Sequence, residues 1–294
     1  KETTNINRQL YLEWFPQVVY NHHQSGPAGT IIFVPPFRDP FNYVYDPLVV
    51  TGVEALGNAI QTRLLVEGKP GATSRGGANY STWFNGALRT TSYFHNMIGL
   101  LTEIVGNPPP MQIPLVARRQ LPSGELTSPV APQLWRFRQS IEYELAANRA
   151  VLDYASRHRD SLLYNIYRMG RNAIERGRRD HWTPRPGRID EIVRLAAQDR
   201  TAAESDVSPE TGEPPTNPVT RLAPRFYDVL RKPEWRDPRG FIVPAEQPDF
   251  PTAVKFINAL VKSGIVIHRA TGDFAVAGKR YRAGSFVVKT DQAF

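Results

Sequence analysis

Cysteine is absent from this chain of 294 residues, and other informative features are absent with it. Without cysteine there are no disulfides, no zinc sites built on thiolates and no cysteine nucleophiles. No apolar run approaches about 18 residues, the length that a membrane-spanning helix needs. Residues 1–5 lack the apolar core of a signal peptide, and they do not begin with methionine. We therefore expect a processed product or a fragment.

Several catalytic motifs are also missing. The sequence has no His-Glu-x-x-His, no Gly-x-Ser-x-Gly and no phosphate-binding loop. Candidate functional residues must therefore be sought where predicted strands end.

What the chain does have is apolar content and positive charge. Hydrophobic residues make up 41% of the sequence, enough for a sizeable core. The net charge is +8, and the densest basic run spans 176–181, with Arg185 and Arg188 beyond it. Charge of this kind suits either nucleic acid or a solvated basic surface. No ladder of stacking aromatic residues accompanies the run, so we favour the solvated surface.

The hydrophobic pattern predicts an α/β fold, with a mixed sheet flanked by helices and then a smaller C-terminal β-α-β module. Met97–Val105 is nearly continuously apolar, which is typical of a central strand covered on both faces. Shorter strands are expected at 17–21 and 30–34, loops at 35–47 and 72–85, and a hairpin at 274–289. Helices are expected at 3–15, 49–64, 132–177 (in one or two pieces), 189–197 and 250–263.

Three of these helices have a stripe of apolar residues that should face the core. The stripes are Ile6, Leu10 and Trp14; Ile141, Leu145 and Leu152; and Ala253, Phe256, Ile257 and Leu260. Residues 201–218 are rich in Pro, Glu, Ser and Thr, which favours a linker. The predicted organisation is a domain at 1–177, a helix and linker at 178–220, and a module at 221–294.

Polar residues follow two of the predicted strands. Val18–Tyr20 continues into Asn21, His22 and His23, and the apolar run from Ile98 reaches Glu103. Since adjacent strand residues face opposite ways, only one of the two histidines can face a given site. Imidazole is a good zinc ligand, and a carboxylate beside an activated water can act as general base. A hydrolytic site is therefore predicted at this edge of the sheet.

Other interpretations of these residues stay open. A structural histidine is the ordinary expectation at a strand end, and Glu103 could form a salt bridge with Arg89. Asn21 and Gln24 could orient an imidazole through its second nitrogen. His95 is expected to be a hydrogen-bonded core histidine rather than a metal ligand.

Three stretches of the sequence, Trp14–Gly26, Thr30–Phe37 and Leu88–Glu103, resemble the zinc carboxypeptidases of the carboxypeptidase A-like superfamily, particularly large exported bacterial members. The likeness continues through Tyr167–Arg171 into the C-terminal module. It implies a zinc-dependent hydrolase of peptide bonds, exported to the periplasm or the extracellular space, whose substrate is a peptide or protein. His23 matches the third zinc ligand and Glu103 matches the general base. Tyr80 is the nearest candidate for the family's substrate-facing tyrosine, and Arg89 is a candidate for binding a substrate carboxylate.

The sequence departs from this family in one important respect. The family's first two zinc ligands form a His-x-x-Glu motif well before the third, and the residues that precede His23 contain no such motif. Asn7-Arg8 matches the family's carboxylate-binding dipeptide but lies on a predicted helix, too close to His23. We therefore expect an N-terminally incomplete catalytic unit that binds its single Zn²⁺ poorly by itself.

Two other functions remain possible from the sequence. A non-catalytic member of the same fold could bind peptides or cell-wall polymer, and the missing ligands favour it if the chain is complete. Nucleic-acid binding through Arg176–Arg188 is the weaker alternative.

Overall fold

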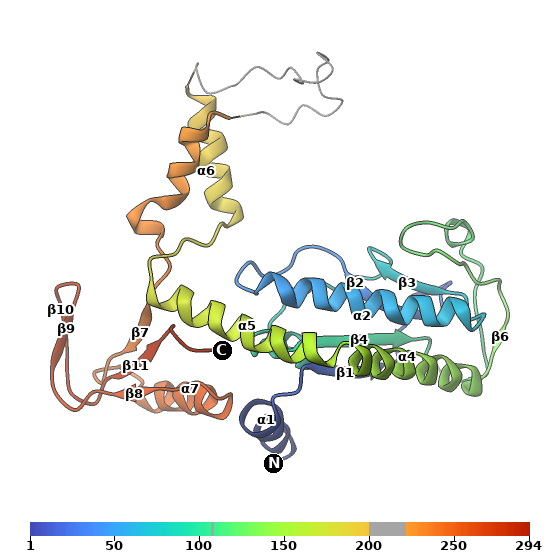
Figure 1. Ribbon diagram of the computed structural model, residues 1–294, viewed down its shortest axis with the longest axis horizontal. Coiled ribbons are helices and arrows are strands. Elements are labelled where there is room, and N and C mark those ends of the chain that lie inside the picture. Colours follow the sequence, from blue (N-terminus) through green and yellow to red (C-terminus); the bar gives the residue numbers. More distant parts are fainter. Residues whose placement is uncertain (107–108, 200–221) are drawn as a thin grey trace.

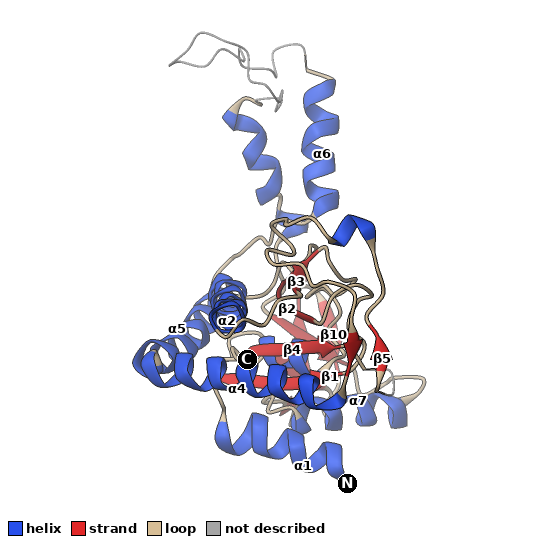
Figure 2. Ribbon diagram, turned by 90° about the vertical axis from the view of Figure 1, so that its right-hand side faces the viewer, coloured by secondary structure: helices blue, strands red, loops and turns tan. Residues whose placement is uncertain are grey.

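The computed structural model describes residues 1–106, 109–199 and 222–294. Its centre is a sheet with the strand order β1-β4-β2-β3 (Figure 2). The strands are β1 (Val18–His23), β2 (Ile32–Phe37), β3 (Ala72–Arg75) and β4 (Ile98–Ile104). β4 runs parallel to β1 and antiparallel to β2, and β2 runs parallel to β3. The predicted mixed sheet is confirmed, although residues 72–75 and 35–37 form strands where we expected loops.

β4 is the central strand that the apolar run predicted, and every one of its residues is buried. Its side chains alternate between the two faces of the sheet. Ile98 points toward Gly52 of helix α2 (Pro47–Val66), whereas Gly99 lies against the backbone of Arg89 in helix α3 (Leu88–Tyr93). The two helices therefore cover opposite faces.

Helices α4 (Phe137–Arg157) and α5 (Arg159–Arg178) follow one another and lie with α2 over the same face of the sheet (Figure 1). The predicted helical region is thus two helices, which meet at His158. The predicted stripe on α4 was wrong, because Ile141, Leu145 and Leu152 are 43%, 46% and 69% exposed. The buried face carries mainly small side chains: Ser140, Tyr143, Ala146, Ala147, Ala150 and Val151. Small residues let α4 pack closely on α2.

The N-terminal segment also differs from its prediction. It forms α1 (Glu2–Arg8) and then a π-helix, η1 (Gln9–Trp14). Ile6 and Trp14 are 45% and 77% exposed, so the stripe through them does not face the core. Tyr11 is buried instead, because the wider π-helical turn changes which side chains share a face.

Two small groups of elements complete the body. β5 (Met111–Gln112) pairs with β6 (Leu134–Trp135), and η2 (Ala117–Arg119) lies between them in sequence. Helix α6 (Pro186–Ala197) packs against the 3₁₀ segment η3 (Pro224–Arg231), and together they project away from the sheet (Figures 1 and 2). The linker predicted at 201–218 lies outside the described residues.

The C-terminal module has the predicted β-α-β connection. After η4 (Pro233–Trp235) come β7 (Gly240–Val243), α7 (Phe250–Lys262) and β8 (His268–Arg269). β11 (Phe286–Lys289) lies between β7 and β8 and is antiparallel to both. The hairpin is shorter than expected and consists of β9 (Phe274–Val276) and β10 (Lys279–Tyr281). On α7, Ile257 is buried as predicted, whereas Phe256 is 55% exposed.

No helix in the described ranges combines the length and the apolar character that crossing a bilayer requires.

Candidate functional site

The two adjacent histidines lie at the end of β1 and face opposite sides of the sheet. His22 is in register with Thr102, and His23 is in register with Glu103. Because side chains alternate along a strand, His22 shares the α4 face with Thr102, and His23 shares the other face with Glu103.

His23 and Glu103 meet on that second face. His23 Nδ1 lies 3.9 Å from Glu103 Oε1, so the two groups face each other without a direct hydrogen bond. The Glu103 side chain is 3% exposed, and that of His23 is 49% exposed. The predicted proximity is confirmed. The roles of metal ligand and general base stay predictions.

Ser25 holds the Glu103 carboxylate in place. Its backbone N–H and its hydroxyl both donate to Oε2, at 2.8 and 2.6 Å. Oε1 is left facing His23, with lone pairs free to accept a proton. Ser25 was not among the residues predicted from the sequence. The signal was Gly26, where a Cβ would lie 2.6 Å from Val105 N, so only glycine lets this turn lie against β4.

Asn21 orients the His23 ring, as predicted. His23 Nε2 lies 2.8 Å from the Asn21 side-chain oxygen, which can only accept a hydrogen bond. In the neutral ring the proton is therefore on Nε2, and the lone pair is on Nδ1. The lone pair on Nδ1, the nitrogen nearest Glu103, is the one that a metal ion could use.

Tyr80 joins the site through Ser25. Its hydroxyl lies 3.0 Å from Ser25 Oγ, and its ring packs on Phe33 with centroids 5.3 Å apart. Burial raises the pKa of Tyr80, and the nearby Glu103 carboxylate raises it further, although Ser25 and Arg89 oppose the shift. The phenol is therefore protonated at neutral pH, and it donates to Ser25 Oγ because the Ser25 hydroxyl donates its own proton to Glu103.

Arg89 lies beside this site rather than in it. Its side chain is 5% exposed, its guanidinium lies 4.4 Å from the centre of the Phe37 ring, and Nη2 donates to the Ser81 carbonyl at 2.7 Å. Nε and Nη1 are buried and make no hydrogen bond. No ion pair joins Arg89 to Glu103 among the described residues, so the salt bridge that we considered for Glu103 does not form.

His22 has a structural set of contacts on the α4 face. Its Nδ1 pairs with Glu144, and its Nε2 lies 3.2 Å from the Asn148 side-chain oxygen. Burial lowers the pKa of His22, but the hydrogen bond and the charge of Glu144 outweigh burial and raise the pKa above its ordinary value. Burial together with Glu144 also raises the pKa of Tyr20, whose hydroxyl lies 3.1 Å from the Thr102 hydroxyl on the same face.

The remaining histidines do not add metal ligands to the site. His95 is 3% exposed and stacks on Tyr11, and its two ring nitrogens lie 3.0 and 2.7 Å from the Thr91 and Ser263 carbonyls, so it is hydrogen-bonded in the core as expected. Within residues 1–106, 109–199 and 222–294 no three His, Cys, Asp or Glu side chains are grouped to hold a metal ion. Since catalytic zinc uses three protein ligands, the residues described here do not form a zinc site by themselves.

Comparisons with known proteins leave the family open. No protein-family model matches this chain, and neither does any curated protein or solved structure.

Proposed function

We propose that the end of β1 and β4 is part of the active site of a metallocarboxypeptidase, which hydrolyses peptide bonds at the C-terminus of a peptide or protein. The observation that carries this proposal is the pairing of a half-exposed imidazole with a buried carboxylate, Nδ1 to Oε1 at 3.9 Å. The resemblance of the surrounding sequence to exported zinc carboxypeptidases supports the same reaction and an exported location.

Glu103 is the proposed general base. Ser25 occupies Oε2 with two hydrogen bonds, so Oε1 is the oxygen that accepts a proton from the attacking water and returns it to the leaving amine. The Tyr80 hydroxyl, which donates to Ser25 Oγ, keeps lone pairs that would accept a hydrogen bond from the substrate. Arg89 is the proposed partner of the substrate carboxylate, because its Nε and Nη1 have no hydrogen-bond partner among the described residues.

The described residues do not fit zinc as a complete ligand set, because no group of three His, Cys, Asp or Glu side chains forms around His23. A zinc enzyme therefore requires further ligands from polypeptide outside these residues. For this reason we derive no reaction step through the metal.

The decisive test uses the protein expressed from its complete gene and the substitution Glu103→Gln. We expect the release of C-terminal residues from a model peptide to fall about 10²–10⁴-fold, the usual contribution of a positioned general base. A peptide with an amidated C-terminus serves as the substrate control. Full activity of Glu103→Gln would contradict the proposal.

That the described part of the chain holds no three-ligand group favours one alternative, a non-catalytic member of this fold that binds peptide or cell-wall polymer. This alternative expects no hydrolysis and no bound zinc in the complete protein. It also expects Glu103→Gln to change the affinity for peptide rather than a turnover rate.

A further inference from the structure

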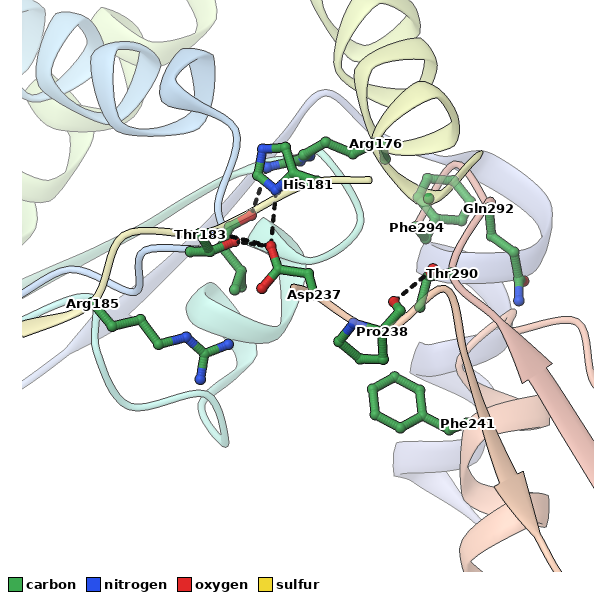
Figure 3. Close-up of a pocket in the computed structure, with 13 residues that line it drawn as sticks. Arg176, His181, Thr183, Arg185, Asp237, Pro238, Phe241, Thr290, Gln292 and Phe294 are labelled. Atoms are coloured by element: carbon green, nitrogen blue, oxygen red, sulfur yellow. Dashed lines mark hydrogen bonds and ion pairs between the residues drawn. The ribbon is translucent and has the colours of Figure 1, made fainter. Parts of the chain in front are cut away.

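A cavity of about 280 Å³ lies away from the His23–Glu103 pair and shares no residue with it. It forms between the end of α5, the segment that follows α5, and the C-terminal module (Figure 3). Its volume is close to the lower limit of about 300 Å³ for small-molecule pockets. The cavity therefore has room for a small ligand.

One wall of the cavity is a fixed polar cluster of His181, Thr183 and Asp237, whose hydrogen bonds Figure 3 shows. Asp237 Oδ2 accepts from His181 Nδ1 at 2.8 Å and from the backbone N–H and the hydroxyl of Thr183, at 2.8 and 2.6 Å. Burial raises the pKa of Asp237, but the hydrogen bonds from Thr183 and His181 outweigh burial and lower the pKa overall. An ionised Asp237 orients the imidazole, and His181 Nε2 has no partner among the described residues.

Two arginines in the cavity wall carry charge that the wall does not neutralise. Arg185 is exposed, and its side chain makes no hydrogen bond or ion pair within the described residues. Arg176 makes a single long hydrogen bond, 3.4 Å, to the Val44 carbonyl. Among the described lining residues Asp237 is the one with a carboxylate side chain, and its hydrogen bonds already engage it. In the view of Figure 3, His181 and Asp237 lie between the two arginines.

Nearby acidic residues do not cancel this charge. Asp180 is next to His181 in sequence, but it pairs with Arg236 and Arg239. The cavity therefore lies within the most basic run of a chain with a net charge of +8. Such a field favours an anion with more than one negative charge.

The opposite wall is apolar. Phe241 lines the cavity with 56% of its surface exposed, and Phe294, Ala173 and Val44 line it as well. An exposed aromatic ring beside unpaired cations suits a ligand with an anionic group at one end and a flat apolar body at the other.

We propose that this cavity binds a phosphate monoester with a flat apolar body. Two guanidinium groups match a dianion better than a monoanionic carboxylate, because each guanidinium pairs with two oxygens of one anion. The Phe241 ring covers the organic part.

Calorimetric titration with phenyl phosphate, inorganic phosphate and benzoate tests the assignment. We expect saturable binding of phenyl phosphate with a Kd below about 1 mM, and weaker binding of the other two probes. Arg185→Gln should weaken both phosphate probes about tenfold, since it removes a charge-assisted hydrogen bond. Phe241→Leu should weaken phenyl phosphate alone.

Arg179→Gln is the matched control. Arg179 is exposed, has no partner among the described residues and does not line the cavity, so its removal changes the net charge equally. The affinity of the Arg179→Gln variant for both phosphate probes should stay within about twofold of that of the parent. Equal losses in the two arginine variants would show binding to diffuse surface charge and overturn the proposal. Absence of saturation, or benzoate binding as tight as phenyl phosphate, would overturn it as well.

Discussion

On the α4 side of the sheet, His22 lies within a closed set of partners, whereas on the other side His23 faces Glu103 across 3.9 Å without a direct bond. Both ring nitrogens of His22 have partners. His23 keeps one nitrogen free, and Ser25 keeps one oxygen of Glu103 free. Two histidines adjacent in sequence thus differ in whether a ring nitrogen is free to bind a ligand. The partner that the strand register brings to each one makes the difference.

The largest expected effect comes from exchanging the two histidines separately for glutamine. In the complete protein, His23→Gln should lower peptide hydrolysis at least about 100-fold, the low end of what losing a reacting group costs. His22→Gln should leave turnover within about threefold, because His22 faces the opposite side of the sheet. Equal losses in the two variants, measured with the same peptide, would remove the proposed difference between the faces.

The sequence contained enough to predict the meeting of His23 and Glu103. Each residue ends an apolar run, and the central strand between covered faces was recognisable from Met97–Val105. Because β1 and β4 are parallel neighbours that end at the same edge of the sheet, these two side chains come together.

What the sequence did not reveal depends on close packing. Ser25 acts on Glu103 only because the turn at Gly26 lies against β4, and no periodicity encodes that contact. On α4, an alanine stripe and a leucine stripe are both periodic. The buried stripe is the one small enough to lie against α2, which depends on the partner helix rather than on hydrophobicity alone.

A smaller effect is expected from a matched pair of hydroxyl deletions, one on each face. Ser25→Ala keeps the backbone hydrogen bond to Glu103 and removes only the hydroxyl, so Oε1 loses part of its orientation. We expect kcat to fall about tenfold, equivalent to about 1.4 kcal/mol, with KM nearly unchanged. A rise in KM with unchanged kcat would instead indicate that Ser25 contacts the substrate.

Thr102→Val is the counterpart on the His22 side. Thr102 is fully buried, and its hydroxyl lies 3.1 Å from that of Tyr20. We expect about 1 kcal/mol lower free energy of unfolding, because the part-buried Tyr20 phenol loses one of its partners, and unchanged kcat. Urea denaturation and the peptide assay separate the two outcomes.

The smallest expected effect is a pH dependence of folding stability that arises on the His22 face of the sheet. Glu144 raises the pKa of His22 above about 6.5, its ordinary value. The charged pair therefore stabilises the fold fully below that pH, and its contribution is lost as the pH rises through the pKa of His22 in the folded state.

Because the His22 and Glu144 side chains are 34% and 18% exposed, we expect the free energies of unfolding of the parent and His22→Gln to differ by only about 0.5–1 kcal/mol. Urea denaturation should show that difference at about pH 5.5 and its decline at about pH 8.5. A difference for His22→Gln that grows with pH would mean that Glu144 does not hold the ring in its charged form.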